Sequence, residues 1–269
     1  MQNFPQNKKH NQKLRMPPVF LTMVMFLMVA QIAEGREKLK IYVENDAAPW
    51  SKADGTGYAN DLVKAIYDAV DVDVDFEVVP YARCKKHTET GEAVGCFNMA
   101  KIPDVENIIT FPESPLFFAY ISYFHNIENP LSASKAEDVK KGTIVGTVIG
   151  YEYDDMFYKL EKEGQITVEE TRSEEMNIKK LGTGRLDAVI LWNNETKPAD
   201  FIIEKAGMAG KVALAFHSTK LELHMGFSKA HPKGELALQK YNEGIKRIQS
   251  NGVYDQITQD WVKRAYSTE

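Results

Sequence analysis

The sequence predicts an α/β protein built as two lobes of similar plan. Segments with alternating apolar and polar residues, typical of strands, are followed by segments with apolar residues at helical spacing. This succession occurs near the amino end and restarts after an extended apolar stretch at 116–124 and a polar stretch at 125–136. Strands joined through helices pair in parallel, because a parallel neighbour requires a crossover connection.

The first lobe begins with a strand in which Leu39, Ile41 and Val43 alternate with polar residues. A loop at 45–58 follows, and then a helix from residue 60, capped by Asn60 or Asp61. The apolar residues at 72–78 alternate with acidic ones, a period of two that only a strand explains. The unit is expected to end with a helix at 83–90 and a strand at 95–99.

The second lobe repeats the alternation of strand and helix. The chain then returns to β structure and finishes with two amphipathic helices. The expected elements are strands at 143–148, 166–170, 187–191 and across 212–227, and helices at 151–161, 173–181, 234–249 and 253–264.

Length and composition are those of a soluble globular protein. The 269 residues, 43% of them hydrophobic, are enough to bury a core. The net charge is −5, and it becomes −8 without the first 35 residues, which hold four basic residues and one acidic residue. An acidic surface with no basic stripe repels phosphate backbones, which argues against nucleic acid as a partner.

Residues 1–35 have the layout of a secretory signal peptide. Basic residues precede an apolar run at 19–29, and the small residues Ala33 and Gly35 follow. The run is short of the ~20 residues that a membrane-spanning helix needs. We expect cleavage after Gly35 and export to the periplasm, with a retained membrane anchor as the alternative.

Cys84 and Cys96 are the only cysteines. In an oxidising compartment an even pair predicts a disulfide, and two reduced, buried thiols are the alternative. The spacing is not that of a zinc knuckle, and the histidines after residue 35 form no H-x-H or H-x3-H pair. No metal site is expected.

Four segments carry a family resemblance. They are GYANDLVKAIY at 57–67, KAEDVKKGTIVGTVIGYEYDDMF at 135–157, LGTGRLDAVIL at 181–191 and IKRIQSNGVYDQITQDWV at 245–262. In this order and with these intervals, the chain resembles the extracellular solute-binding proteins of family 3, the periplasmic substrate-binding subunits of polar amino-acid ABC transporters. The likeness spans about residues 38–264.

The resemblance implies a type II periplasmic-binding-protein-like fold. Each lobe would be a mostly parallel sheet flanked by helices, and two hinge strands, near 118–126 and 216–223, would join the lobes. Lobe 1 would comprise 36–124 and 222–269, and lobe 2 would comprise 125–221. A ligand would bind in the crevice, beyond the carboxyl ends of the strands.

In the first loop, Trp50 occupies the place of an aromatic residue that the family keeps there, and Tyr58 matches another. Either ring could stack on a flat or cationic part of a solute, or could pack into the lobe. Glu44, at the end of the first strand, is the nearest ionised acceptor; it could receive an amine or cap a loop.

Both ends of the family's clamp for a zwitterion are missing. Where the family has S-x-T-x-x-R after the third strand, with the arginine on the ligand carboxylate, this chain has Ile102 and Val105 in place of the threonine and the arginine. The acid that follows the D-A-V-V strand is replaced by the segment 191–194. We therefore expect that an α-amino acid is not held in the usual way.

Arg83 is the best remaining anion partner, with a surface ion pair as its alternative. The turn at Gly150 and Tyr151 is expected to lead into a helix amino terminus, which favours a negative ligand group. Glu152 would oppose that unless it faces solvent. Neutral hydrogen-bonding and stacking capacity comes from three further candidates, Asn98, Trp192 and Asn193, with Asn194 beside them.

The expected function is capture of a small polar solute by a monomer, with a membrane permease or a sensor as partner and no cofactor. The alternatives are a periplasmic enzyme on the same fold, as in the dehydratases that resemble these proteins, and a ligand sensor without a transport role. Glu44, Glu152, Glu195 and His217 are available as acids or bases. No nucleophile motif accompanies them, so catalysis is not expected.

Overall fold

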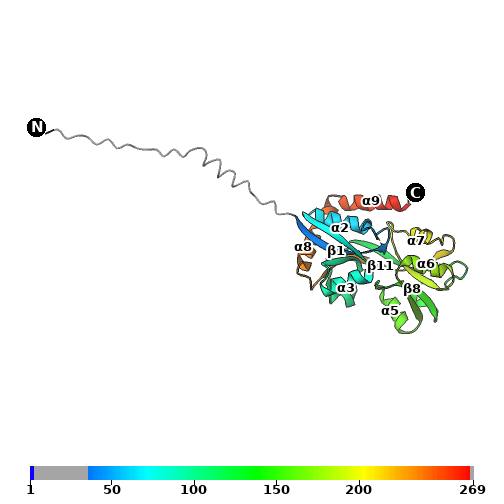
Figure 1. Ribbon diagram of the computed structural model, residues 1–269. Helices are drawn as coiled ribbons and strands as arrows, with labels where there is room; N and C mark the ends of the chain where they lie inside the picture. The colour runs from blue at the N-terminus through cyan, green and yellow to red at the C-terminus, as the bar shows by residue number, and fades with distance from the viewer. Residues whose placement is uncertain (3–35, 267–269) are drawn as a thin grey trace. The chain divides into compact units, whose positions relative to one another are not determined.

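The computed structural model describes residues 1–2 and 36–266, and residues 36–266 form one compact unit (Figure 1). All but two residues of the predicted signal peptide lie outside the described residues. No helix in the described part of the chain is both long and apolar enough to cross a membrane.

One long sheet runs through this unit in the strand order β4-β1-β5-β11-β7-β10-β8-β9, with β6 paired to β11. β1 pairs in parallel with β4 and β5, and β8 pairs in parallel with β9 and β10. The strands are β1 (Glu37–Glu44), β4 (Val72–Val79), β5 (Gly95–Ala100), β6 (Ile109–Thr110), β7 (Phe117–Asn126), β8 (Thr143–Val148), β9 (Ile166–Thr171), β10 (Ala188–Asn193) and β11 (Val212–Ser228), and a separate hairpin joins β2 (Asp46–Ala47) to β3 (Ser51–Lys52).

The long antiparallel pair β7 and β11 connects the two parallel parts of the sheet. These two strands contain the segments predicted as hinges. We call β1, β4 and β5, with the helices around them, the first half, and β8, β9 and β10, with theirs, the second half. The predicted fold class, two mostly parallel α/β lobes joined by two strands, is confirmed. The predicted residue boundaries of the lobes stay a prediction.

Helices cover each half separately (Figure 1). In the first half, α2 packs on both carboxy-terminal helices, α8 and α9, while α3 packs on β1 and β5. In the second half, α5 packs on β9, and α6 packs on β8, β10 and α7. The helices are α2 (Tyr58–Asp68), α3 (Tyr81–Thr90), α4 (Pro103–Glu106), the 3-10 turn η1 (Ala136–Asp138), α5 (Asp155–Lys162), α6 (Glu174–Gly182), α7 (Ala199–Lys205), α8 (Gly234–Ser250) and α9 (Val253–Tyr266).

Two glycines permit close backbone approaches in the first half. Gly57 precedes α2 with a φ of 148°, and a Cβ there would lie 2.3 Å from the Trp50 carbonyl oxygen. Gly244 of α8 touches α2 so closely that a Cβ would lie 2.0 Å from the Ile66 carbonyl oxygen. Both contacts hold α2 and the first loop in place beside the end of β1.

The helix predicted to begin directly after Gly150 begins at Asp155 instead. The side chain of Asp154 caps it by accepting a hydrogen bond from the Phe157 amide at 2.8 Å, so the preceding residues form a loop. Gly150 has a φ of 86°, which starts this loop. The prediction of a helix terminus at Gly150 was wrong. The helix end that was expected to favour an anion is therefore not present at Gly150 and Tyr151.

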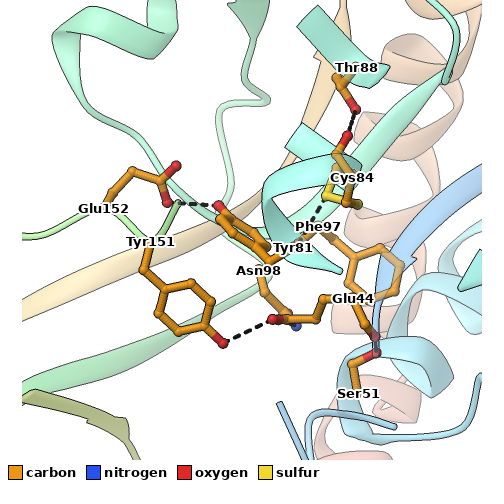
Figure 2. The surroundings of a disulfide bond; sticks show 10 residues. Glu44, Ser51, Tyr81, Cys84, Thr88, Phe97, Asn98, Tyr151 and Glu152 are labelled. Carbon is orange, nitrogen blue, oxygen red and sulfur yellow. Dashed lines mark hydrogen bonds between the residues drawn. A yellow bond between two sulfur atoms is a disulfide. The ribbon is translucent and has the colours of Figure 1, made fainter. Parts of the chain in front are cut away.

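The disulfide between Cys84 and Cys96 is confirmed; it joins α3 to β5, with the two Cα atoms 5.7 Å apart. Both cysteine side chains are fully buried, and Figure 2 shows the surroundings of the bridge. The bridge therefore fixes the start of α3 against the strand that carries Asn98.

Replacing both cysteines with alanine should lower the free energy of unfolding by about 2–3 kcal/mol, because the unfolded chain regains the freedom of the closed loop. Thermal unfolding with and without reductant, alongside intact mass, measures this. An unfolding temperature that stays the same after the mass shows full reduction would contradict it.

Candidate functional site

A cavity of about 420 Å³ opens where the carboxyl ends of four parallel strands meet. β1 and β4 contribute from the first half, and β8 and β9 from the second. In parallel sheets this edge is where loops converge and ligands bind. The lining residues are Glu44, Asn45, Asp46, Pro80, Tyr81, Ala82, Arg83, Val148, Ile149, Tyr151 and Arg172.

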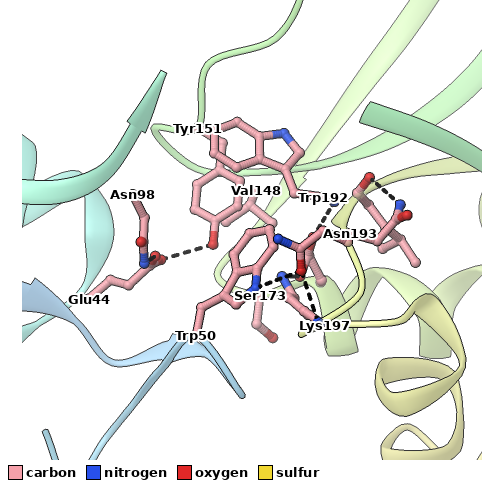
Figure 3. A network of polar contacts seen from close by, with 12 residues as sticks. Glu44, Trp50, Asn98, Val148, Tyr151, Ser173, Trp192, Asn193 and Lys197 are labelled. Atoms are coloured by element: carbon pink, nitrogen blue, oxygen red, sulfur yellow. Dashed lines mark hydrogen bonds and ion pairs between the residues drawn. The ribbon is translucent and has the colours of Figure 1, made fainter. Parts of the chain in front are cut away.

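Glu44 ends β1 at the wall of the cavity and is buried. Its Oε1 accepts a hydrogen bond from the Asn98 amide at 2.8 Å, and its Oε2 accepts one from the Tyr151 hydroxyl at 2.9 Å (Figure 3). Burial raises the pKa of Glu44 to about 7, against the two hydrogen bonds, which lower it. Because Tyr151 belongs to the second half, this contact spans the two halves.

Glu152 makes a second contact between the halves (Figure 2). Glu152 is buried. Its carboxylate accepts a hydrogen bond from the Tyr81 hydroxyl at 2.7 Å and forms an ion pair with the Lys85 ammonium at 2.7 Å. Both partners lie on α3. From the sequence, Glu152 was expected to repel an anion unless its side chain faced solvent. The structure shows a third arrangement, in which Glu152 is buried and its charge is paired with Lys85.

A third set of contacts joins Trp50 to the second half (Figure 3). The Trp50 Nε1 donates to the Thr196 hydroxyl at 3.0 Å and to the Asn194 Oδ1 at 3.2 Å. The Lys197 ammonium lies 4.4 Å from the centroid of the Trp50 ring and forms an ion pair with Glu174, with both charged side chains buried. The indole face is therefore already occupied by a cation of the chain itself.

Arg83 and Arg172 line the cavity from opposite halves, and both are exposed. Within residues 36–266 neither guanidinium forms an ion pair or a hydrogen bond. The alternative considered for Arg83, a surface ion pair, is not what the structure has. Sequence reasoning missed Arg172; its signal was its position directly after the strand predicted at 166–170.

Comparison with solved structures decides the fold. An ancestral arginine-binding protein bound to arginine matches with a TM-score of 0.72 and 22% identity, over 85% of this chain and 99% of that one. A histidine kinase sensor domain with similarity to periplasmic binding proteins matches with a TM-score of 0.72 and 16% identity, over 85% and 97%. The chain has the fold of periplasmic amino-acid-binding proteins.

A third match is to a binding protein that is described as the precursor of an enzyme. The ancestral amino acid-binding protein AncCDT-1, a precursor of cyclohexadienyl dehydratase, gives a TM-score of 0.66 and 20% identity over 90% of this chain and 99% of that one. No family model matches the sequence, and no curated protein is detectably similar to it.

Within this binding-protein fold, several predicted site residues come together. Glu44, Asn98 and Tyr151 form one hydrogen-bonded group, and Trp192 packs on Tyr151 with ring centroids 4.7 Å apart. The indole Nε1 of Trp192 is buried without a partner among the described residues. Gly150 lies against Ala82 of α3, where a Cβ would come within 3.0 Å of the Ala82 Cβ.

Two other predicted residues lie elsewhere. Tyr58 is buried against Phe117, and its hydroxyl shares a hydrogen bond with Thr258 at 3.0 Å, so of the two alternatives its ring is packed in the first half. Asn193 donates to the Ser122 hydroxyl at 2.8 Å across β7 and β10. Neither residue lines the cavity, and of all the predicted site residues only Glu44, Arg83 and Tyr151 do.

The structure also accounts for the missing clamp. Val105, at the position of the family's arginine, is buried in the core of the first half. Positive charge at the cavity wall instead comes from Arg83 and Arg172, and acidic groups there come from Glu44 and Asp46. The buried ion pair of Glu174 and Lys197 acts on Glu44 from the second half.

Proposed function

We propose that this chain is an exported binding protein that closes two lobes on a small polar solute and presents the closed form to a membrane partner. The observation that carries the proposal is the cavity, whose wall is shared by strand ends of both halves. A solute there would contact both halves at once. Its binding free energy would therefore favour the closed arrangement.

The contacts around the cavity support closure as a two-state event. Glu44–Tyr151, Tyr81–Glu152 and Trp50–Thr196 each join one half to the other by a hydrogen bond. The long strands β7 and β11 also connect the two halves, with the geometry of a hinge. We propose an ABC-type permease or a sensor as the partner, the second because a kinase sensor domain shares the fold.

A dehydratase-like enzyme is the second candidate, favoured by one observation. Glu44 lies at the cavity wall with a pKa raised to about 7 by burial, the value that suits a general acid or base near neutral pH. Against it, both carboxyl oxygens already accept hydrogen bonds. Mass analysis of the solute after incubation separates the two: recovery unchanged supports binding, and conversion supports catalysis.

The test uses purified chain, stripped of solute by unfolding and refolding, in a metabolite screen by thermal shift. A solute that binds only the folded chain should raise its stability by about 2.7 kcal/mol at a hundredfold excess over Kd. Ile149→Trp should abolish the response, because Ile149 is exposed and lines the cavity, which an indole would fill. Leu236→Trp, on the exposed face of α8, is the matched control and should respond normally.

Solute responses that survive Ile149→Trp would place binding outside the cavity and contradict the proposal. Two negative results together would also contradict it: no metabolite stabilises the refolded chain, and native mass spectrometry finds no small molecule on the chain as first purified.

A further inference from the structure

We propose that the solute carries a carboxylate, and that Arg83 of the first half and Arg172 of the second half hold this group together. The inference rests on the proposed function and names the chemical class of its solute. At its other end the solute would present a hydrogen-bond donor to the acidic side of the same cavity.

The two arginines at the cavity wall form no ion pair with any of the described residues. Other basic side chains beside the contact between the halves already have acidic partners: Lys85 pairs with Glu152, and Lys197 pairs with Glu174. Arg83 and Arg172 alone among the cavity-lining residues are basic, and within the described part of the chain neither has an acidic partner.

Two like charges that face one cavity from opposite halves repel each other when the halves close. An anion between them would replace this repulsion with two charge-assisted contacts. The guanidinium group suits a carboxylate because its donors form a planar fork that matches the two carboxylate oxygens. The same anion would thus supply affinity and favour closure.

The backbone around Arg83 points to the same kind of group. Pro80, Tyr81 and Ala82, which line the cavity, are the start of the ten-residue helix α3. No side chain in the described part of the chain caps this end, and the first turn of α3 contains no acidic residue. The amides of Tyr81 and Ala82 precede the first intrahelical hydrogen bond, which the Arg83 amide makes to Pro80. An anion beside Arg83 would also meet this helix end.

The acidic side of the cavity defines the other end of the solute. Glu44 accepts hydrogen bonds from Asn98 and Tyr151, and the exposed Asp46 lies two residues further along the chain. Both are acceptors at the wall, so they favour a hydroxyl, amide or ammonium group and disfavour a second carboxylate. The class is therefore a small carboxylic acid with a donor at the far end, including an amino acid held in a reversed or displaced pose.

The experiment compares small carboxylic acids with their neutral amides by calorimetry, on wild type and on Arg83→Gln and Arg172→Gln. Each variant should raise the Kd of the acid about ten- to a hundredfold, the loss expected for a charged hydrogen bond, while the amides bind weakly throughout. Arg185→Gln, an exposed arginine that does not line the cavity, is the matched control and should stay within about twofold. Arg83→Lys should recover part of the affinity, since it keeps the charge and loses the fork.

Equal binding of acids and amides, or unchanged affinity in both glutamine variants, would overturn the carboxylate assignment. The proposed function would still stand in that case if Ile149→Trp abolished binding of the same solutes. If Ile149→Trp left binding intact, the cavity itself would be the wrong site, and both proposals would fall.

Discussion

Lys197→Met is expected to lower the free energy of unfolding by about 3–5 kcal/mol, the cost of leaving a buried charge without its partner. Lys197 and Glu174 have side chains that are 1% and 4% exposed, and they form an ion pair. Glu174 Oε1 accepts a hydrogen bond from the Trp192 amide at 2.7 Å. The variant would also remove the cation from the Trp50 ring, and with it one contact between the halves.

Chemical denaturation of four proteins measures this effect: wild type, Lys197→Met, Glu174→Gln and the double variant. The double variant should be more stable than Lys197→Met alone, because its remaining groups carry no charge. Lys179→Met is the matched control, since Lys179 pairs with Glu175 on the exposed surface of α6 and should cost at most about 1 kcal/mol. A Lys197→Met protein as stable as this control would show that the buried pair is not formed in solution.

The wild-type chain is expected to lose roughly 3 kcal/mol of its free energy of unfolding as the pH rises and the buried Glu44 ionises. Glu44→Gln should remove this loss. Burial raises the pKa of Glu44 from 4.5 to about 7 in the folded chain. Between these two values the folded chain binds a proton that the unfolded chain has released. Stability from this group is therefore complete below about pH 4.5, falls as the pH rises to about 7, and stays low above it.

The groups that face Glu44 decide whether a glutamine at this position can satisfy its hydrogen bonds. Asn98 and Tyr151 donate to it, and the charges of Lys197 and Glu174 act on it from the second half with opposite sign. The Asn98 Oδ1 is buried without a partner among the described residues. A glutamine at position 44 could therefore donate to that oxygen if the Asn98 amide turned over.

Denaturation at a series of pH values from 4.5 to 8.5 measures the difference in stability between Glu44→Gln and wild type. This difference should shift in favour of the variant as the pH rises. Glu113→Gln, at an exposed glutamate, is the control and should give a difference that does not depend on pH. A flat difference for Glu44→Gln as well would mean that the Glu44 carboxyl titrates alike in the folded and unfolded chains.

Periodic patterns explain why most of the fold could be predicted. The alternation at 72–78 became β4, and the amphipathic stretches near the carboxyl end became α8 and α9. The periodic pattern did not locate the start of a helix where a single capping side chain sets it. Asp154 caps α5, so this helix starts at Asp155 and not at residue 151 as predicted. The short helices α4 and α7 were missed, because four and seven residues leave too little periodicity to recognise.

The site could be predicted only where residues follow strands directly. Glu44 and Arg83 were found because each lies at or just after a strand end, and Arg172 could have been found by the same argument. Lys197 and Glu174 could not, because they are 23 residues apart and each lies in a polar segment that resembles a surface. The ammonium of Lys197 also lies 4.4 Å from the centroid of the Trp50 ring, which belongs to the other half and is 147 positions away in the sequence.

A crystal structure of the chain with a saturating carboxylic acid solute would show whether a carboxylate binds between Arg83 and Arg172. We expect the solute in the cavity between the halves, with its carboxylate in contact with Arg83 and Arg172 and its other end facing Glu44. A solute bound outside this cavity, or a cavity that stays empty when the chain is saturated, would mean that the two arginines do not form the binding site.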